Sequence, residues 1–491
     1  MRCGWLRWGG LALVLAMAGC GGGGDSTETT VSGSGLNALG LSPAVSLSED
    51  PANPTKQTPV TTNVTVPTTG NPDPTDTSGL PNTLRVVVED GPHGFQFSAN
   101  ANILYATVTV CKPNTTPAVC QEIDHVQVDT GSVGLRVLAS KVRSLNLDPV
   151  LLSGTDPTWE CYPFVIGGLW GQTAMANVTL GPQTTTSPIP IQMIEDDPNA
   201  AIQATSGCQT ATDNHILSSA AALGSNGILG IGATDIDCGY SCIAGDYTGT
   251  YVQYYNCNAA TTPICSAAPA MGANYLTRNP VDALPTPYNN GVVLKMPAVT
   301  NPGAATATGV LILGVGTVAN NMVPGNAQRV YLGTDYTNHP DSYLRATTRF
   351  NGVDFLDSYL DTGTNGLFFT DSSITRCTAN VWYCPASVLN VSATISDGDN
   401  PTLNPVGVNF QIGNAEALFS TNNTAFSGAA GPTPPPTSSA PATTAKTFAW
   451  GMPFFYGRKV YLTVSRLNTT HNPSANTPPL SPPPWNAWAP L

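Results

Sequence analysis

Two aspartates in this 491-residue sequence begin the same short pattern, and together they could carry out acid–base chemistry. Asp129 and Asp361 each follow a strand-like apolar run, and each is followed by Thr, Gly and a hydroxyl residue. A Gly and a Leu then follow at the same distances in both copies. Aspartates also form ordinary turns where strands end, but two copies with matching flanks favour a paired site. The residues that complete the two copies are Thr130, Gly131 and Ser132, and Thr362, Gly363 and Thr364.

Two such turns facing each other would bring two carboxyl groups close enough to share one proton. Glycine lets the chain approach closely enough for backbone N–H groups to hold each carboxylate, and each Thr can lock its turn by hydrogen bonding to the other copy. Like charges at that distance do not both ionise, so one pKa rises and the other falls. The pair could then hold a water molecule, with one Asp taking its proton and the other protonating a scissile carbonyl oxygen. The pattern therefore predicts Asp129 and Asp361 as catalytic residues.

With three further segments, the two copies resemble the pepsin-like aspartic proteases. Residues 226–232 resemble the apolar segment that crosses behind the first catalytic loop in that family, and residues 448–455 resemble its partner in the second lobe. Residues 309–314 resemble the strand near the junction of the lobes, and all five segments stand in the family's order. The resemblance implies a mostly β, two-lobed double β-barrel with an internal pseudo-twofold. It also implies an aspartic endopeptidase that acts on extended peptide or protein substrates.

The hairpin that closes over the active site in that family is where this sequence departs from the pattern. Counting back from the glycines of its return strand places the family's tyrosine on Phe164, with Tyr162 two residues before it. The tryptophan that usually partners the tyrosine falls on Arg136. Tyr162 or Trp170 could supply the missing contact. These departures leave open a second function, in which the chain is a catalytically silent binding or structural protein of the cell envelope.

The residue after each triplet bears on the pH of the reaction. Ser132 and Thr364 both place a hydroxyl where it can donate to the outer oxygen of its own aspartate. Such a bond favours the charged carboxylate and lowers the first pKa of the pair. In the family that the chain resembles, a hydroxyl here accompanies acid activity. We therefore expect a bell-shaped profile on the acid side of neutrality.

The composition is typical of a β-rich protein rather than a helical one. Charged residues make up only 10% of the chain, while Gly and Pro number 48 and 43. A net charge of −13 argues against nucleic acid as a partner. Gly314–Ala319 imitates a dinucleotide-binding loop, but nearby Pro324 would interrupt the helix such a loop requires, so no cofactor is expected. The strand-like runs are Ile103–Val110, Ile123–Val128, Val178–Leu180, Val292–Met296, Val310–Leu313, Val330–Leu332, Phe355–Leu360 and Val460–Val464.

The first residues are expected to form an export signal, because basic residues precede a short apolar stretch. Residues 17–20 end in Cys20 and resemble a bacterial lipobox, in which that cysteine carries a lipid; an ordinary signal peptide with an incidental cysteine is the alternative. The lipobox predicts a protein held in the bacterial cell envelope, touching the membrane only through the lipid. The expected organisation is a signal peptide at 1–19, a disordered lipid-anchored tether at 20–82, an N-terminal lobe at 83–300, a C-terminal lobe at 301–468 and a Pro-rich tail at 469–491.

Ten further cysteines follow Cys20, an even number that indicates disulfides in an exported protein. Sequence does not fix their connectivity, and closeness along the chain only suggests pairs. A zinc site is the alternative, but no C-x-x-C is present and the five histidines are scattered, so no metal is expected. The suggested pairs are Cys111/Cys120, Cys238/Cys242, Cys257/Cys265 and Cys377/Cys384, with Cys161/Cys208 remaining.

Overall fold

The fold is known from a computed structural model that describes most of the chain beyond residue 79. The described ranges are 80–92, 101–152, 156–164, 167–212, 214–238, 242–243, 252–258, 264–334, 344–379, 381–433, 447–467 and 480–491. The predicted signal peptide, Cys20 and residues 20–79 of the predicted tether lie outside these ranges, as do residues 469–479 of the predicted tail.

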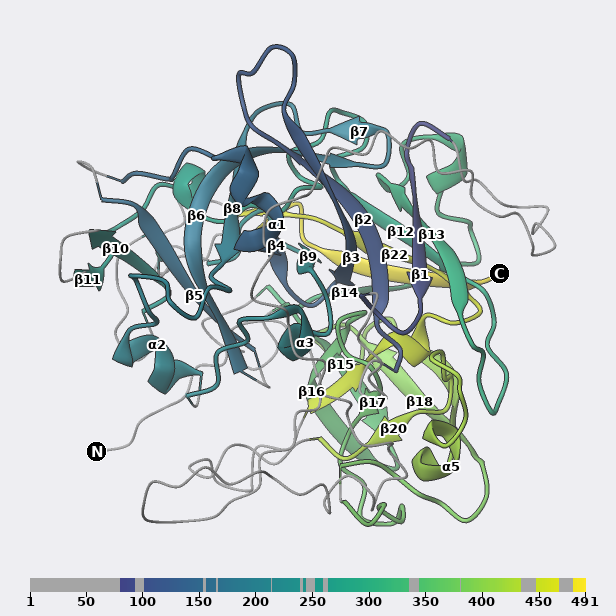
Figure 1. Ribbon diagram of the computed structural model, residues 1–491. Coiled ribbons are helices and arrows are strands. Elements are labelled where there is room, and N and C mark those ends of the chain that lie inside the picture. Colours follow the sequence, from purple (N-terminus) through teal and green to yellow (C-terminus); the bar gives the residue numbers. More distant parts are fainter. Residues whose placement is uncertain are drawn as a thin grey trace, which may run out of the picture.

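Sixteen strands form one large, strongly curved sheet that makes up the upper body of the molecule in Figure 1. Its spatial order runs β11-β10-β5-β6-β8-β4-β9-β3-β2-β1-β13-β12-β22-β25-β14, with β7 paired to β6. The strands are β1 (Thr83–Val88), β2 (Leu104–Cys111), β3 (Cys120–Asp129), β4 (Val133–Leu138), β5 (Thr158–Phe164), β6 (Gly167–Leu180), β7 (Gln183–Thr184), β8 (Ile189–Ile194), β9 (Gly227–Ile231), β10 (Tyr254–Asn258), β11 (Ile264–Ala267), β12 (Gly291–Met296), β13 (Ala307–Leu313), β14 (Gln328–Tyr331), β22 (Arg458–Thr463) and β25 (Trp485–Pro490).

A second sheet of seven strands lies below the first in Figure 1 and forms the other lobe, in the order β19-β18-β15-β16-β21-β17-β20. Its strands are β15 (Ala346–Phe350), β16 (Val353–Leu360), β17 (Leu367–Phe368), β18 (Leu389–Ser396), β19 (Val406–Ile412), β20 (Ala430–Gly431) and β21 (Thr447–Trp450). β23 (Arg466–Leu467) and β24 (Leu480–Ser481) pair with each other. The helices are α1 (Ala139–Val142), α2 (Ser206–Ala211), α3 (Ala220–Leu223) and α5 (Ala415–Phe419), with single 3-10 turns η3 (Arg143–Leu145), η4 (Ala273–Tyr275), η5 (Ala319–Asn321) and η8 (Met452–Phe454).

The predicted mostly β, two-lobed architecture is confirmed, and each of the eight strand-like runs falls on a strand. Short runs of β-branched and apolar residues, separated by turn residues, favour strands because such side chains pack well on a pleated surface. No helix in the described part of the chain is long and apolar enough to cross a membrane.

The two sheets repeat one local arrangement, which is the internal pseudo-twofold expected from the sequence. In the large sheet, β9 pairs in parallel with β3 and antiparallel with β4, so it lies behind the loop between them. In the second sheet, β21 pairs in parallel with β16 and antiparallel with β17 in the same way. Residues 226–232 and 448–455 therefore occupy the crossing positions predicted for them. Each aspartate begins the loop that such a trio encloses.

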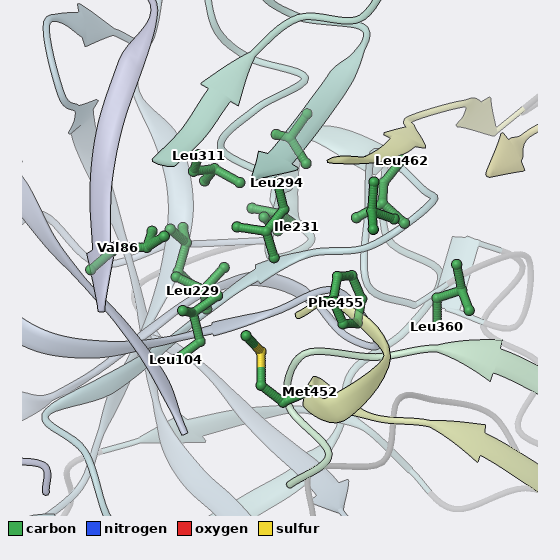
Figure 2. Packing of buried hydrophobic residues seen from close by; sticks show 14 of the residues in the cluster. Val86, Leu104, Leu229, Ile231, Leu294, Leu311, Leu360, Met452, Phe455 and Leu462 are labelled. Carbon is green, nitrogen blue, oxygen red and sulfur yellow. The ribbon is translucent and has the colours of Figure 1, made fainter. Parts of the chain in front are cut away.

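One continuous hydrophobic core runs under both loops and joins the lobes. Figure 2 shows Leu229 and Ile231 of β9 packed between apolar side chains of the other strands of the large sheet, with Met452 and Phe455 close by. Leu360, the residue before the second aspartate, belongs to the same buried cluster. Each fully buried side chain of this size contributes about 1.5–3 kcal/mol through removal of its surface from water. The core therefore fixes the positions of the strand ends that carry the carboxyl groups.

The C-terminal segment corrects the predicted organisation. Residues 469–491 were expected to be a Pro-rich tail, but β25 pairs along β22 and β14 inside the large sheet. The three prolines at 482–484 directly precede this short apolar strand and made the segment resemble a tail in the sequence. Ala487 and Trp488 of the strand are buried on its opposite faces. The predicted lobe boundary at 300/301 also falls inside this sheet, because β12, β13 and β22 lie side by side there (Figure 1).

All five suggested disulfides are present. Cys111 faces Cys120 across β2 and β3, and Cys257 faces Cys265 across β10 and β11. The longest bridge joins Cys161 of β5 to Cys208 of α2 over 47 residues of sequence. This bridge ties the strand that carries Tyr162 to the helix beside it.

Removing the Cys161–Cys208 bridge should destabilise the protein more than removing Cys111–Cys120. Closure of a loop of 47 residues lowers the entropy of the unfolded chain by more than closure of nine, and a chain-entropy account gives about 4 and about 3 kcal/mol respectively. Urea unfolding of Cys161→Ala/Cys208→Ala and Cys111→Ala/Cys120→Ala under oxidising conditions measures both. A smaller loss for the longer bridge would contradict this expectation.

Candidate active site

The structure brings Asp129 and Asp361 together, one from each lobe. Asp129 is the last residue of β3, and Asp361 directly follows β16. Both residues are completely shielded from solvent. A Cβ atom built on Gly131 would lie 2.6 Å from Cγ of Asp361, and one built on Gly363 would lie 2.6 Å from Oδ1 of Asp129. Each glycine therefore faces the carboxyl group of the opposite loop.

Each carboxyl group is held by its own loop through the same set of donors. Gly131 N–H donates to Oδ1 of Asp129 over 2.8 Å, and the Ser132 hydroxyl donates to Oδ2. Gly363 N–H donates to Oδ1 of Asp361 over 2.7 Å, and the Thr364 hydroxyl donates to Oδ2 over 2.6 Å. The hydroxyls after the two triplets thus lie where the sequence pattern placed them.

The two threonines lock the loops to one another across the lobes. Thr130 N–H donates to Oγ1 of Thr362 over 3.2 Å, and Thr362 N–H donates to Oγ1 of Thr130 over 3.0 Å. The Thr130 hydroxyl donates to the Leu360 carbonyl, and the Thr362 hydroxyl donates to the Val128 carbonyl. This reciprocal set keeps the two carboxyl groups at a fixed separation.

The electrostatics make one of the two carboxyl groups the holder of a proton. Burial raises the pKa of Asp361 well above its usual range, and the negative charge of nearby Asp129 and a hydrogen bond to it raise that pKa further. The Thr364 hydroxyl and the Gly363 N–H act in the opposite direction but do not cancel the effect. The raised pKa means that Asp361 keeps its proton to a higher pH than an ordinary aspartate does.

A methyl group on Gly131 should disable the site while leaving the fold intact. The added Cβ would fall on the carboxyl group of Asp361, so one loop must move, and a displacement of about 1 Å costs a catalytic site about 10²-fold in rate. Gly407→Ala in β19 is the matched control, because nothing lies within 4 Å of its Cβ position. Peptide-cleavage rates and thermal unfolding of both variants provide the comparison. Equal activity of Gly131→Ala and the wild type would contradict the tight apposition of the loops.

β5 and β6 form the expected hairpin beside the first catalytic loop, with Tyr162 opposite Leu169 and Phe164 opposite Gly167. Tyr162 and Phe164 are buried in contact with each other, their ring centroids 5.0 Å apart. Burial raises the pKa of Tyr162, and the charge of Asp129 contributes to this shift, so Tyr162 lies within electrostatic reach of the catalytic loop.

Trp170, the other candidate for the missing tyrosine contact, does not lie on the same face of the hairpin as Tyr162. It lies opposite Cys161 on the other face of the hairpin, because successive strand residues point to opposite faces. Its ring stacks on Trp159, and its indole N–H donates to the Ile202 carbonyl. Trp170 therefore stabilises the outer side of the hairpin rather than the catalytic side.

Sequence reasoning missed a buried charge cluster between the first loop and the hairpin. The guanidinium of Arg136 lies 2.7 Å from Oε1 of Glu160 and 2.7 Å from Oδ2 of Asp237, and all three side chains are fully buried. Gln253, Tyr254 and Thr277 donate further hydrogen bonds to the two carboxyl groups. A charged residue between Leu135 and Val137, inside an apolar strand, was the available signal for such a cluster.

One group of potential metal ligands lies within the described ranges. Cys377, Cys384 and Glu416 lie within ligand distance of one another, but the two cysteines are joined in a disulfide. Their sulfur atoms are therefore not thiolates and do not provide the charged ligands that a metal site of this type uses.

Three comparisons place the chain among known proteins. A family model described as "Protein of unknown function (DUF3443)" matches residues 78–479. No curated protein matches the chain significantly. Among solved structures, the aspartic proteinase from Irpex lacteus is similar at 14% sequence identity with a TM-score of 0.41, over 83% of this chain and 97% of that chain. The chemistry of the site therefore has to be derived from the residues of this chain.

Proposed function

Because the chain belongs to the DUF3443 family, whose description assigns no function, we propose from the geometry of its own site that it is an aspartic endopeptidase. The observation that carries the proposal is the pair of buried carboxyl groups, each held by its own Gly N–H and hydroxyl and locked to the other through Thr130 and Thr362. A turn that only ended a strand would need none of this reciprocal bonding.

In this reaction the two carboxyl groups act on a water molecule and a peptide carbonyl. Ionised Asp129 takes a proton from the water molecule while the water oxygen attacks the carbonyl carbon. Protonated Asp361 gives its proton to the carbonyl oxygen. Collapse of the resulting gem-diol breaks the C–N bond, and the proton on Asp129 passes to the leaving amine. The gem-diol proton returns to Asp361, so the starting protonation state is restored.

Access to the pair requires a movement of the side chains that cover it, because neither aspartate is exposed. The hairpin of β5 and β6 lies beside the strand that follows the first loop, and its Tyr162 and Phe164 pack in one buried cluster with Leu138 of that strand. An extended peptide would bind beneath this hairpin and be shielded from bulk water there. Such exclusion of water strengthens the electrostatic interactions of the site.

The proposed setting is the bacterial cell envelope, with a lipid on Cys20 as the anchor. Five disulfides support export, since such bonds persist in oxidising compartments. Labelling of cells with a radioactive fatty acid should mark the wild type and leave Cys20→Ser unmarked. Equal labelling of both would rule out Cys20 as the lipid site.

The proposal is tested by incubating the purified protein with a peptide library between acid and neutral pH and identifying new termini by mass spectrometry. We expect cleavage within the peptides, strongest at acid pH and blocked by a pepstatin-type inhibitor. Absence of cleavage at every pH would favour the alternative, a silent envelope protein that binds ligands or other proteins. Cleavage that the inhibitor leaves untouched would indicate a contaminating peptidase.

A further inference from the structure

Arg136 connects two parts of the site that otherwise come from separate elements. It lies in β4, four residues beyond Ser132, and its guanidinium donates to the carbonyl of Val133 at the start of that strand. The same group contacts Glu160 of β5 over 2.7 Å and lies 3.7 Å from the centre of the Tyr162 ring. One buried side chain thus joins the end of the first catalytic loop to the hairpin.

The cluster around Arg136 is built so that this cation stays charged and fixed. Burial opposes its charge, but Glu160 and Asp237 overcome that effect and raise the pKa of Arg136. Burial and the negative charge of Glu160 raise the pKa of Asp237, and a hydrogen bond joins the two carboxyl groups. Ion pairs to two buried carboxyl groups from different parts of the chain therefore hold the guanidinium of Arg136 in one place.

The contact with Tyr162 depends on this fixation. A guanidinium over an aromatic face is attracted by the negative face of the ring, and more strongly when both groups are shielded from water. The planar group of Arg presents donors in several directions at once, which Lys does not. Gln253 donates to Glu160 and to Asp237, and the Tyr254 hydroxyl donates to Asp237 over 2.8 Å, so the partners of Arg136 are themselves held.

We propose that Arg136 is a positioning residue: its ion pair with Glu160 and its stacking on Tyr162 hold the β5–β6 hairpin over the first catalytic loop. The proposal rests on the proposed peptidase function for its consequence on substrate binding, but the placement of the hairpin is a separate property. Arg136 does not contact the reacting atoms. It acts through Tyr162 and through the strand that carries Tyr162.

The experiment compares four variants of the full chain by hydrogen–deuterium exchange of the amides in residues 158–164 and 167–180. Removing Arg136 alone would leave buried carboxyl groups without a cation, so Arg136→Met is combined with Glu160→Gln and Asp237→Asn to give a neutral cluster of similar volume. Tyr162→Leu removes the ring and keeps the ion pairs, whereas Tyr162→Phe keeps the ring. Arg143→Met is the matched control, because Arg143 lies in the same lobe and its ion pairs are exposed.

We expect exchange in the hairpin to accelerate at least tenfold in the neutral triple variant and in Tyr162→Leu, and to stay within twofold of the wild type in Tyr162→Phe and Arg143→Met. Exchange in β18 and β19 should not change in any of them. With a cleaved peptide in hand, the first two variants should raise KM about tenfold with little change in kcat.

Hairpin exchange within twofold of the wild type in the triple variant would overturn the proposal. Loss of protection throughout the chain, including β18 and β19, would also overturn it, because the cluster would then stabilise the whole fold rather than the hairpin. The exchange measurement needs no substrate, so it decides the role of Arg136 even if the protein cleaves no peptide.

Discussion

Replacing Asp129 or Asp361 with Asn is expected to reduce peptide turnover by at least about 10³-fold, because general acid–base catalysis of this kind contributes about 10²–10⁴-fold and each carboxyl group has its own part in it. In Asp129→Asn the amide would not accept a proton from water, and in Asp361→Asn it would not supply one to the carbonyl oxygen. The amide keeps the shape of the carboxyl group, so the near-UV circular dichroism spectrum should not change. Initial rates of peptide cleavage measure the effect.

Asp354→Asn is the matched control for this pair. Asp354 lies on β16, seven residues before Asp361, and its ion pair with Arg349 is largely exposed, so its loss should leave turnover within twofold of the wild type. Full activity in either catalytic variant would mean that the two aspartates do not form the active site. Unfolding of both variants would mean that the carboxyl groups serve the fold.

The second prediction concerns the stability of Asp361→Asn, which should increase although the variant loses its activity. Asp361→Asn should raise the free energy of unfolding at neutral pH above that of the wild type. Burial, together with the charge of Asp129, raises the pKa of Asp361 in the folded state. Between the ordinary pKa and this raised value, the folded chain binds a proton that the unfolded chain has released, so stability falls as pH rises.

The contribution of Asp361 to stability is therefore fully present below the ordinary pKa of an aspartate and is lost as pH rises through the raised value. Asn does not titrate, so the advantage of Asp361→Asn should be small at pH 3 and should grow toward pH 7. Urea unfolding at several pH values provides the curve. An advantage that shrinks with rising pH would contradict the raised pKa.

Much of this site could be predicted from the sequence because the repeated pattern specifies its own geometry. Asp-Thr-Gly with a hydroxyl residue encodes a tight turn, its backbone donors and its side-chain lock within four residues. The structure shows these local bonds at Asp129 and again at Asp361. The pairing of the ten cysteines could also be predicted from the sequence, since four of the five bridges join cysteines at most nine residues apart.

What the sequence did not predict depends on contacts between distant segments. Glu160 and Asp237 reach Arg136 only after β4, β5 and the chain following β9 have packed together. The sequence left Tyr162 and Trp170 as alternatives for the missing contact, because the pairing of β5 with β6, which decides the face on which each side chain lies, is not visible in it. The strand β25 was not predicted because three prolines precede it. Its pairing with β22 and β14 is determined only by the tertiary fold.

The most direct test of the central claim, that two carboxyl groups sharing one proton hydrolyse a peptide, is the pH dependence of kcat/KM for the best peptide from the library. We expect a bell-shaped curve on the acid side of neutrality, whose acid limb reports ionisation of the pair and whose alkaline limb reports loss of the proton from Asp361. Because the pKa of Asp361 is raised, the alkaline limb should lie above the range of an ordinary carboxyl group. A kcat/KM that rises with pH and shows no alkaline limb would contradict the claim, since loss of the proton from Asp361 should end the reaction.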